Sequence, residues 1–150
     1  MIPLSSNKLH NMAIRNHSTR LLIERGADVN AMNSYATRVF PGETFVSSAP
    51  LYYAAKWSTE CVALLLQHGA QVNIQDDTTN ETALYQACIG NNIECTELLI
   101  KNGADVNSRD ALGRTILRRL KEHSAGPQGD ANPRQYDDMI DLLKRHGATE

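Results

Sequence analysis

The sequence predicts an all-α fold in which pairs of helices stack into an open array, because one phrase recurs along the chain and each copy ends on a glycine. The phrase reads LLIERGADVN from Leu21, LLLQHGAQVN from Leu64 and LLIKNGADVN from Leu98, and a shortened copy, LLKRHGA, begins at Leu142. Repetition of this kind is typical of stacked units that share a core rather than of a single closed globule.

Each copy of the phrase has the pattern of a helix that stops at its glycine. Paired leucines suit the buried face of an amphipathic helix, and the glycine supplies the positive φ that closes a helix without a Cβ clash. The glycines are Gly26, Gly69, Gly103 and Gly147, and they lie 43, 34 and 44 residues apart. The leucines expected in the shared core are Leu21, Leu22, Leu64, Leu65, Leu98, Leu99, Leu142 and Leu143.

A second helical segment precedes the phrase in each unit. In the third unit it begins at Thr82, a favourable N-cap residue, and reads TALYQA over Thr82–Ala87. The second unit has PLYYAA over Pro50–Ala55. These segments resemble the T-P-L-H-x-A signature of the ankyrin repeat, a unit of about 33 residues. The resemblance extends from about Ser6 to Ala148, which is nearly the whole chain.

The resemblance to the ankyrin repeat implies both a fold and a division of the chain. The implied fold is all-α: an ankyrin-type helix-pair solenoid with β-hairpin-like loops between the repeats. A single array is expected over residues 1–150, with repeats at about 6–30, 31–73, 74–107 and 108–148. The first repeat is shorter than the third, so either its inter-helix turn is tighter or its first helix is poorly formed.

Two insertions interrupt the regular spacing. Asn30 and Pro50 are 20 positions apart, whereas the regular connection from Asn107 to Ile116 takes 9, so the loop 31–49 is eleven residues longer. The second insertion lies between the helices of the fourth unit and includes Ser124–Pro133, a segment rich in turn formers and poor in apolar residues. We expect this second insertion to form a flexible surface loop.

Composition and charge restrict the partners and the compartment. The net charge of −2 at pH 7 does not favour nucleic acid or an anionic membrane as a partner. No apolar run approaches the roughly 20 residues of a membrane-spanning helix, and the first residues lack the basic and apolar parts of a secretory signal. We therefore expect a protein inside the cell, in the cytoplasm with the nucleus as an alternative. We also expect it to be a monomer.

The sequence gives no reason to expect a catalytic, metal or cofactor site. It has no phosphate-binding glycine loop and no HExxH or G-x-S-x-G motif. Its three cysteines cannot all pair with one another, and no Cys or His cluster has metal-ligand spacing. Cys61, Cys88 and Cys95 are expected to be buried thiols in a reducing compartment.

The resemblance also implies where a protein partner binds, on a concave surface formed by hairpin tips and the exposed side of each first helix. By register, the predicted contact residues on the first helices are Ile14, Arg15, Lys56, Trp57 and Ile89, and those at the tips are Asp77, Thr78, Glu81, Ala111, Leu112 and Arg114. Tyr35 and Phe40 in the loop 31–49 either pack back on the array or present apolar contacts to the partner.

Two features of this surface allow two interpretations each. Trp57, the only tryptophan, is either a binding anchor or a side chain that leans on the long loop. A basic excess in the fourth unit either attracts an acidic segment of a partner or forms a solvated end face. The basic residues are Arg109, Arg114, Arg118, Arg119 and Lys121. The same stretch contains two acidic residues, Asp110 and Glu122.

Two asparagines resemble modification sites of the family. Asn30 and Asn107 each follow Asp-Val and have a leucine eight positions earlier, a context in which hairpin asparagines of ankyrin repeats are β-hydroxylated. The alternative is that each asparagine only caps its turn.

The function that the resemblance implies is a non-catalytic module for protein–protein interaction. One alternative is an adaptor or substrate-recognition segment of a larger assembly, such as a ubiquitin ligase or a scaffold. An enzyme is a further alternative, which requires a pocket with converging ionisable groups that the sequence does not suggest.

Overall fold

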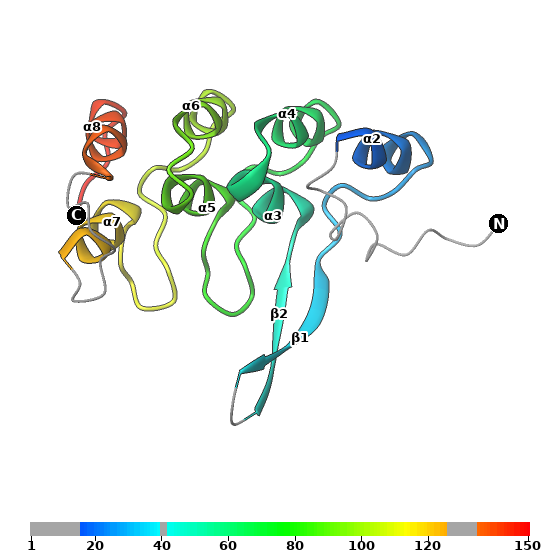
Figure 1. Ribbon diagram of the computed structural model, residues 1–150, viewed down its shortest axis with the longest axis horizontal. Helices are drawn as coiled ribbons and strands as arrows, with labels where there is room; N and C mark the ends of the chain where they lie inside the picture. Colours follow the sequence, from blue (N-terminus) through cyan, green and yellow to red (C-terminus); the bar gives the residue numbers. More distant parts are fainter. Residues whose placement is uncertain (1–15, 40–41, 126–134) are drawn as a thin grey trace.

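The computed structural model describes residues 16–39, 42–125 and 135–150. Its helices form two layers that run along the length of the molecule (Figure 1). The outer helices are α2 (Asn16–Glu24), α4 (Thr59–Gln67), α6 (Ile93–Lys101) and α8 (Asp137–Arg145), and the inner helices are α3 (Pro50–Trp57), α5 (Ala83–Ile89) and α7 (Ile116–Ala125). The expected helix-pair solenoid is thereby confirmed, although the segments 1–15 and 126–134 of the first and fourth units lie outside the described residues.

Local signals in the sequence start and stop these helices. Pro50 stands in the first turn of α3, where its missing N–H leaves no bond unmade. Ser58 and Thr82 cap α4 and α5, because their hydroxyl oxygens accept from the amides of Cys61 and Tyr85. Gly69 follows α4 with a φ of +85° and ends that helix as predicted.

The longest connection between units is a β-hairpin. Strand β1 (Asn33–Val39) pairs antiparallel with β2 (Gly42–Ser48), and the register runs from Asn33 opposite Ser48 to Val39 opposite Gly42. The two shorter connections each contain a single antiparallel bridge, Gln75 with Thr82 and Arg109 with Thr115. All three connections extend from the same side of the inner helices, and the β1–β2 hairpin reaches farthest (Figure 1). The insertion in the loop 31–49 therefore lengthens a hairpin that the other units keep short.

The base of the long hairpin is tied to the next connection. The Ser48 hydroxyl, at the end of β2, donates a hydrogen bond to Asp76, and both side chains are buried. Side-chain positions in the middle of the hairpin lie outside the described residues. Tyr35 is placed only by its backbone, opposite Val46, and Phe40 is not described at all. Whether these two aromatic residues pack on the array therefore stays a prediction.

The core runs continuously between the two layers of helices. Leu65, Leu99 and Leu143 occupy equivalent positions in α4, α6 and α8 and are each 0% exposed. The prediction was wrong for Leu21, which is 36% exposed, and Leu98 is only partly buried. Adjacent residues of a helix point about 100° apart, so one leucine of a pair faces the neighbouring helices while the other lies at the edge of the contact.

The cysteines are buried in this core, as predicted. Cys61, Cys88 and Cys95 are all free thiols and each is 0% exposed. Burial raises the pKa of Cys88 and of Cys95 to about 12. Within the described part of the chain, no group of three or more His, Cys, Asp or Glu side chains is placed to hold a metal ion. The same residues contain no helix long and apolar enough to cross a bilayer.

Candidate protein-binding surface

Two aspartates shape the tips of the shorter connections. Asp76 Oδ1 accepts hydrogen bonds from the amides of Thr78 and Thr79 at 2.9 and 2.6 Å. Asp110 Oδ1 accepts in the same way from the amides of Leu112 and Arg114, both at 2.9 Å. A carboxylate that accepts two amide bonds fixes the backbone of a tight turn. The backbone of each tip is therefore stabilised by hydrogen bonds within the chain.

Neighbouring tips are also joined to each other. The amide of Ala111 donates to the carbonyl oxygen of Thr79 at 2.8 Å. Asp77 and Thr78 on one tip and Ala111 and Leu112 on the next remain exposed. Leu112 is the extreme case, since 73% of it is exposed. A large apolar side chain at a fixed tip is available for contact with another molecule.

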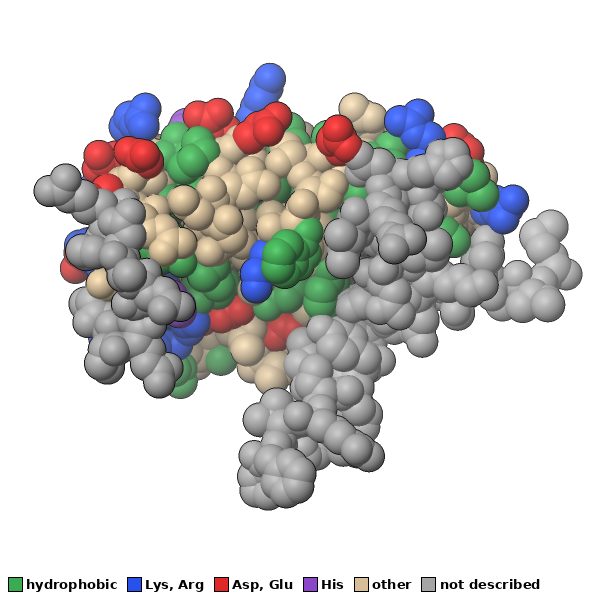
Figure 2. Space-filling view, in the orientation of Figure 1, with side chains coloured by type: hydrophobic (Ala, Val, Ile, Leu, Met, Phe, Trp, Pro, Cys, Tyr) green, Lys and Arg blue, Asp and Glu red, His purple; other side chains and the backbone are tan. Residues whose placement is uncertain are grey.

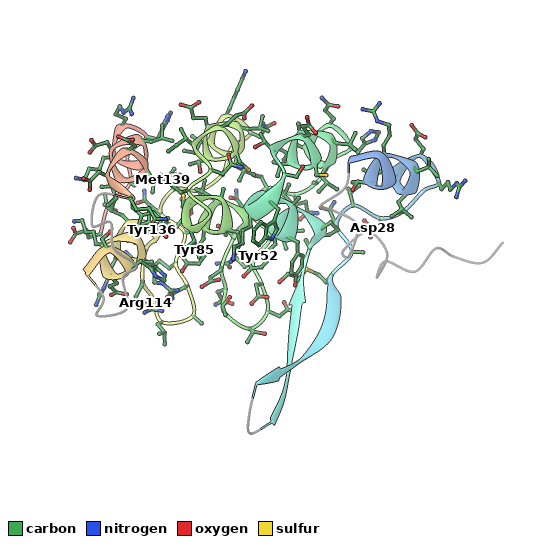
Figure 3. All side chains as sticks on the ribbon, viewed as in Figure 1. Asp28, Tyr52, Tyr85, Arg114, Tyr136 and Met139 are labelled. Carbon is green, nitrogen blue, oxygen red and sulfur yellow. The ribbon has the colours of Figure 1, made fainter. Side chains whose placement is uncertain are left out.

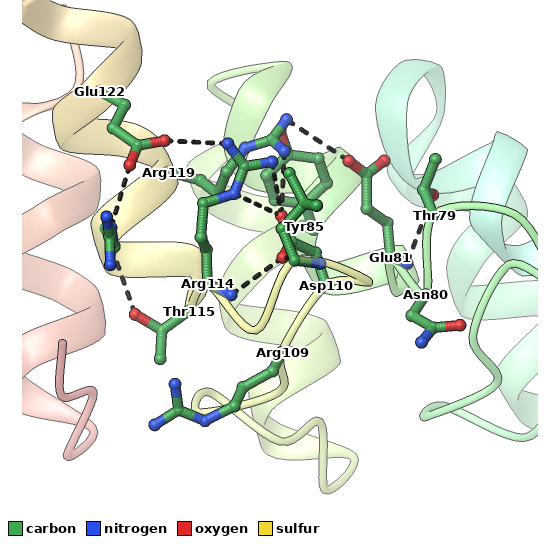
Figure 4. A network of polar contacts seen from close by, with 12 residues as sticks. Thr79, Asn80, Glu81, Tyr85, Arg109, Asp110, Arg114, Thr115, Arg119 and Glu122 are labelled. Carbon is green, nitrogen blue, oxygen red and sulfur yellow. Dashed lines mark hydrogen bonds and ion pairs between the residues drawn. The ribbon is translucent and has the colours of Figure 1, made fainter.

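An arginine of the fourth unit connects the two shorter connections and the third unit beneath the tips (Figure 4). Arg119 lies 3.0 Å from Asp110 Oδ2 and 3.5 Å from Glu81 Oε1, and it also donates a hydrogen bond to the Tyr85 hydroxyl. Its guanidinium carbon stands 5.0 Å from the centre of the Tyr85 ring. The side chains of Asp110, Glu81 and Arg119 are 8%, 11% and 19% exposed, so these contacts are largely shielded from water.

The polar network continues along the inner helices to the second unit. The Tyr52 hydroxyl donates to Glu81 Oε2 at 3.1 Å and accepts from Gln86 Nε2 at 2.7 Å. Figure 3 shows Tyr52, Tyr85 and Arg114 in succession on the hairpin side of the inner layer. Tyr52 on α3, Glu81 before α5 and Arg119 on α7 thus form one chain of contacts across three units.

The pKa values in this network move in opposite directions. Burial raises the pKa of Glu81 above its ordinary range, and burial raises the pKa of Tyr85 to about 12. At Asp110, burial acts in the same upward sense, but hydrogen bonds from the backbone and side chain of Arg114 outweigh it and lower the pKa. Asp110 is therefore the carboxylate that the fold stabilises in its charged form.

The predicted basic cluster is largely neutralised within the protein. Arg114 pairs with Asp110 at 2.9 Å and with Glu122 at 3.2 Å, and Arg118 pairs with Glu122 at 3.0 Å. Arg109 has no ion pair with any residue that the structure describes, and its guanidinium donates to the carbonyl of Gly113 at 2.7 Å. Arg119 pairs with Asp110 and Glu81, and Lys121 pairs with Glu150. Arg109 is therefore the one basic residue of the cluster without an ion pair among the residues described.

A ladder of asparagines joins each outer-helix loop to the next. Asn30 Nδ2 donates to the carbonyl of Gly69 at 3.0 Å, and Asn73 Nδ2 donates to that of Gly103 at 3.0 Å. Asn107 repeats the bond with Gly147 at 3.1 Å. In each case the amide oxygen accepts a backbone N–H of the same neighbouring loop, at 2.7 to 2.9 Å. The ladder therefore runs through every described unit.

These contacts support the capping role of Asn30 and Asn107. The backbone amides of the two residues donate to Asp28 and Asp105, both at 2.9 Å, so each asparagine is fixed at its backbone and at both ends of its side-chain amide. Their hydroxylation is not addressed by these contacts and stays a prediction.

Comparison with known proteins identifies the repeated unit. Residues 9–110 match a family model described as ankyrin repeats in three copies. This chain belongs to the ankyrin-repeat family. A search of curated proteins finds no significant match. Beyond the matched range, α7, α8 and the bond from Asn107 to Gly147 keep the pattern of the preceding ankyrin repeats. Ankyrin repeats are generally modules for protein–protein interaction.

In this ankyrin array, the predicted contact residues fall into groups. Asp77, Thr78, Ala111 and Leu112 are exposed at the tips, whereas Glu81 and Arg114 lie in the polar network. Ile89 is partly buried on α5. Ile14 and Arg15 lie outside the described residues.

The structure places Lys56 and Trp57 together at the end of α3, away from the tips. Trp57 is 64% exposed, and Lys56 Nζ lies 5.0 Å from the centre of its ring. The other side chains around Trp57 belong mainly to the outer helices, since it lines a cleft with residues of α4 and α6. The sequence predicts Trp57 on the concave surface with the tips, whereas in the structure it lies beside the outer helices α4 and α6.

Sequence reasoning missed Tyr52, Tyr85 and Arg119 as members of the inner-helix network. A signal was present for the tyrosines, because both occupy the histidine position of the ankyrin signature and so begin inner helices at equivalent places. No comparable signal existed for Arg119, whose partners Glu81 and Asp110 come from two different connections.

Proposed function

We propose that this chain is a non-catalytic ankyrin module that binds a protein partner on the surface formed by its hairpin tips and inner helices. The observation that carries the proposal is the pair of joined, internally hydrogen-bonded tips that expose Asp77, Thr78, Ala111 and Leu112. A surface that is already ordered loses little conformational entropy when it binds, which favours affinity.

The polar network supports this surface rather than forming a reactive site. Each ionisable group at its centre is occupied by an internal partner: Arg119 by Asp110 and Glu81, and Tyr52 by Glu81 and Gln86. Contacts that cross three units fix the spacing of the tips. We therefore assign Glu81 and Arg114 a positioning role, and we assign contact with the partner to the exposed tip residues.

The β1–β2 hairpin extends the proposed surface. It projects on the same side as the tips and reaches beyond them (Figure 1). We propose that Tyr35 and Phe40 contribute contacts there, and that the array of four repeats acts as a monomer. On the face in Figure 2, acidic and basic side chains alternate along the outer helices without a large region of one sign among the residues described. Specificity is then expected from local contacts rather than from long-range attraction.

The test compares two exposed leucines. Leu112→Asp places a charge on the tip, and Leu21→Asp makes the same change at an exposed leucine on outer helix α2. Each folded variant is immobilised, and proteins captured from a lysate of the native host are quantified by mass spectrometry. We expect a partner that is retained by Leu21→Asp and lost with Leu112→Asp. Equal capture by the wild type and the two variants excludes the tip from the binding surface.

A further inference from the structure

A cleft lies at the turns between the inner and outer helices, away from the hairpin tips. It has a volume of about 620 Å³ and lies between Trp57, the start of α4 and the start of α6. Its apolar lining comes from Ala63 and Leu98, and its charged lining comes from Glu60 and Glu94. The partial burial of Leu98, next to the fully buried Leu99, is explained by its position on this cleft.

Trp57 is the aromatic wall of the cleft. It is the only tryptophan of the chain and it is 64% exposed. Lys56 Nζ already lies 5.0 Å from the centre of its ring, which shows that the indole accepts a cation where it stands. Trp57 also lines the cleft and is largely exposed, so part of its indole is accessible to a second cation from the cleft side.

Two carboxylates stand at the same cleft without a cationic partner. Glu60 and Glu94 occupy equivalent positions in the first turns of α4 and α6. Both are exposed, and neither forms an ion pair with a residue in the part of the chain that the structure describes. Acidic residues are favourable at helix N-termini, but that preference does not require two of them to line one cleft with a tryptophan.

We propose that this cleft binds an arginine side chain from an extended segment of a protein partner. The guanidinium stacks on Trp57 and donates hydrogen bonds to Glu60 and Glu94, while an apolar neighbour of the arginine packs on Ala63 and Leu98. Arginine fits better than lysine because its planar group both stacks on an aromatic face and donates in a fork that matches a carboxylate.

This second surface is independent of the tip surface. It is formed by the turns and outer helices, and none of its residues takes part in the network around Arg119. The cleft is also acidic and suits a cationic group, whereas Arg109 on the tip side suits an anionic one. An array that uses both surfaces contacts one partner at two places, or two partners at once.

The experiment uses the whole chain and two capped tripeptides, Leu-Arg-Ala and the uncharged Leu-citrulline-Ala. The indole N–H resonance of Trp57 reports binding at this position alone, because the chain has one tryptophan. Two double variants are compared with the wild type. E60Q/E94Q removes two charges from the cleft, and E24Q/D141N removes two exposed charges on the outer helices α2 and α8 that do not line it.

We expect the arginine peptide to shift the Trp57 resonance saturably at millimolar concentration, and the citrulline peptide to bind at least about fivefold more weakly. E60Q/E94Q should weaken arginine binding by a similar factor, and E24Q/D141N should leave it within about twofold. The absence of a saturable shift, or equal binding of the two peptides to the wild type, overturns the proposal. Equal weakening by the two double variants also overturns it, because the attraction is then general and not located in the cleft.

Discussion

Asp110 combines two tasks in one carboxylate. One oxygen accepts the amides of the tip, and the other pairs with Arg114 and Arg119. Glu81 also pairs with Arg119, but among the described residues it accepts no comparable set of backbone hydrogen bonds, and burial raises its pKa. Two acids that flank one arginine therefore differ in what their charge contributes to folding.

Substitution of these two acids tests that difference. Asp110→Asn is expected to lower the free energy of unfolding by roughly 1–3 kcal/mol at neutral pH, since charged hydrogen bonds are lost. Glu81→Gln is expected to stay within about 1 kcal/mol of the wild type, because the buried carboxylate gives up a desolvation cost together with its ion pair. Urea denaturation at pH 7 measures both, and a larger loss for Glu81→Gln contradicts the assignment.

The pH dependence of the Asp110 contribution has a defined sign. The pKa of Asp110 in the folded state is lowered. Its contribution to the free energy of unfolding is therefore complete above the unfolded-state pKa of about 3.9, and it is lost as pH falls through the folded-state pKa. For Glu81, with a raised folded-state pKa, the contribution is present below about 4.3 and is lost as pH rises. The difference between wild type and Asp110→Asn should thus shrink on acidification to about pH 3. A difference that is unchanged between pH 7 and pH 3 rules out the ionised carboxylate as its source.

The buried leucines show how much one position in the core contributes. Leu99→Ala is expected to cost about 2–5 kcal/mol, because Leu99 is 0% exposed and leaves a cavity. Leu21→Ala, at 36% exposure, is expected to cost less than about 1 kcal/mol. Chemical denaturation measures both values. Similar costs for the two substitutions show that the assigned core is wrong.

The buried thiols report on whether the helices that cover them unfold transiently in the native protein. Cys88 and Cys95 have pKa values raised to about 12 by burial, and Cys61 is also 0% exposed. The thiolate is the reactive form of a cysteine, so we expect a thiol-specific disulfide reagent at pH 8 to label the native chain slowly. In denaturant, the same reagent should label all three thiols rapidly. Rapid labelling of any cysteine in the native state contradicts the burial of that residue.

At the scale of elements, the loops are as regular as the helices. Each connection keeps the asparagine ladder even though one carries the β1–β2 hairpin and the others carry short tips. The extra residues enter at the far end of the connection, where they do not disturb the bond between neighbouring loops. Insertions of this kind lengthen the binding side of the array and leave its stacking intact.

Removing one rung of the ladder tests its contribution. Asn73→Ala loses the bonds to Gly103 and Asp105 in the next unit and is expected to cost roughly 1–3 kcal/mol. Asn102→Ala loses only a bond to Leu98 in its own helix end and is expected to cost less than about 1 kcal/mol. Thermal unfolding compares the two variants. An equal decrease in the midpoint temperature for both variants shows that the bonds between loops stabilise the protein no more than the bond from Asn102 to Leu98 does.

The elements were predictable from sequence because their signals are local. Thr82 begins α5 and Gly69 ends α4 by the conformational preferences of single residues. The ladder and the Arg119 network were not predictable in the same way, since they join residues from different units and depend on how the units stack. Trp57 was predicted to be exposed and is, but its neighbours on α4 and α6 follow only from the packed structure.

At the scale of the molecule, stability is expected to come from contacts between successive units. The inner helices α3 and α5 pack closely against each other, whereas the outer helices α4 and α6 touch at fewer places. The described buried side chains of successive units belong to one continuous cluster, so each interface stabilises the two units that form it. The tips are kept in line by the same stacking, which links the stability of the array to the surface proposed for binding.

Double-mutant cycles between equivalent leucines test this claim most directly. Leu65 and Leu99 lie in neighbouring units, whereas Leu65 and Leu143 are separated by one unit. From urea denaturation of the single and double alanine variants, we predict a coupling free energy of at least about 0.5 kcal/mol for the neighbouring pair and less than about 0.5 kcal/mol for the separated pair. Equal coupling in both pairs contradicts an open array and indicates a single core shared by the whole chain.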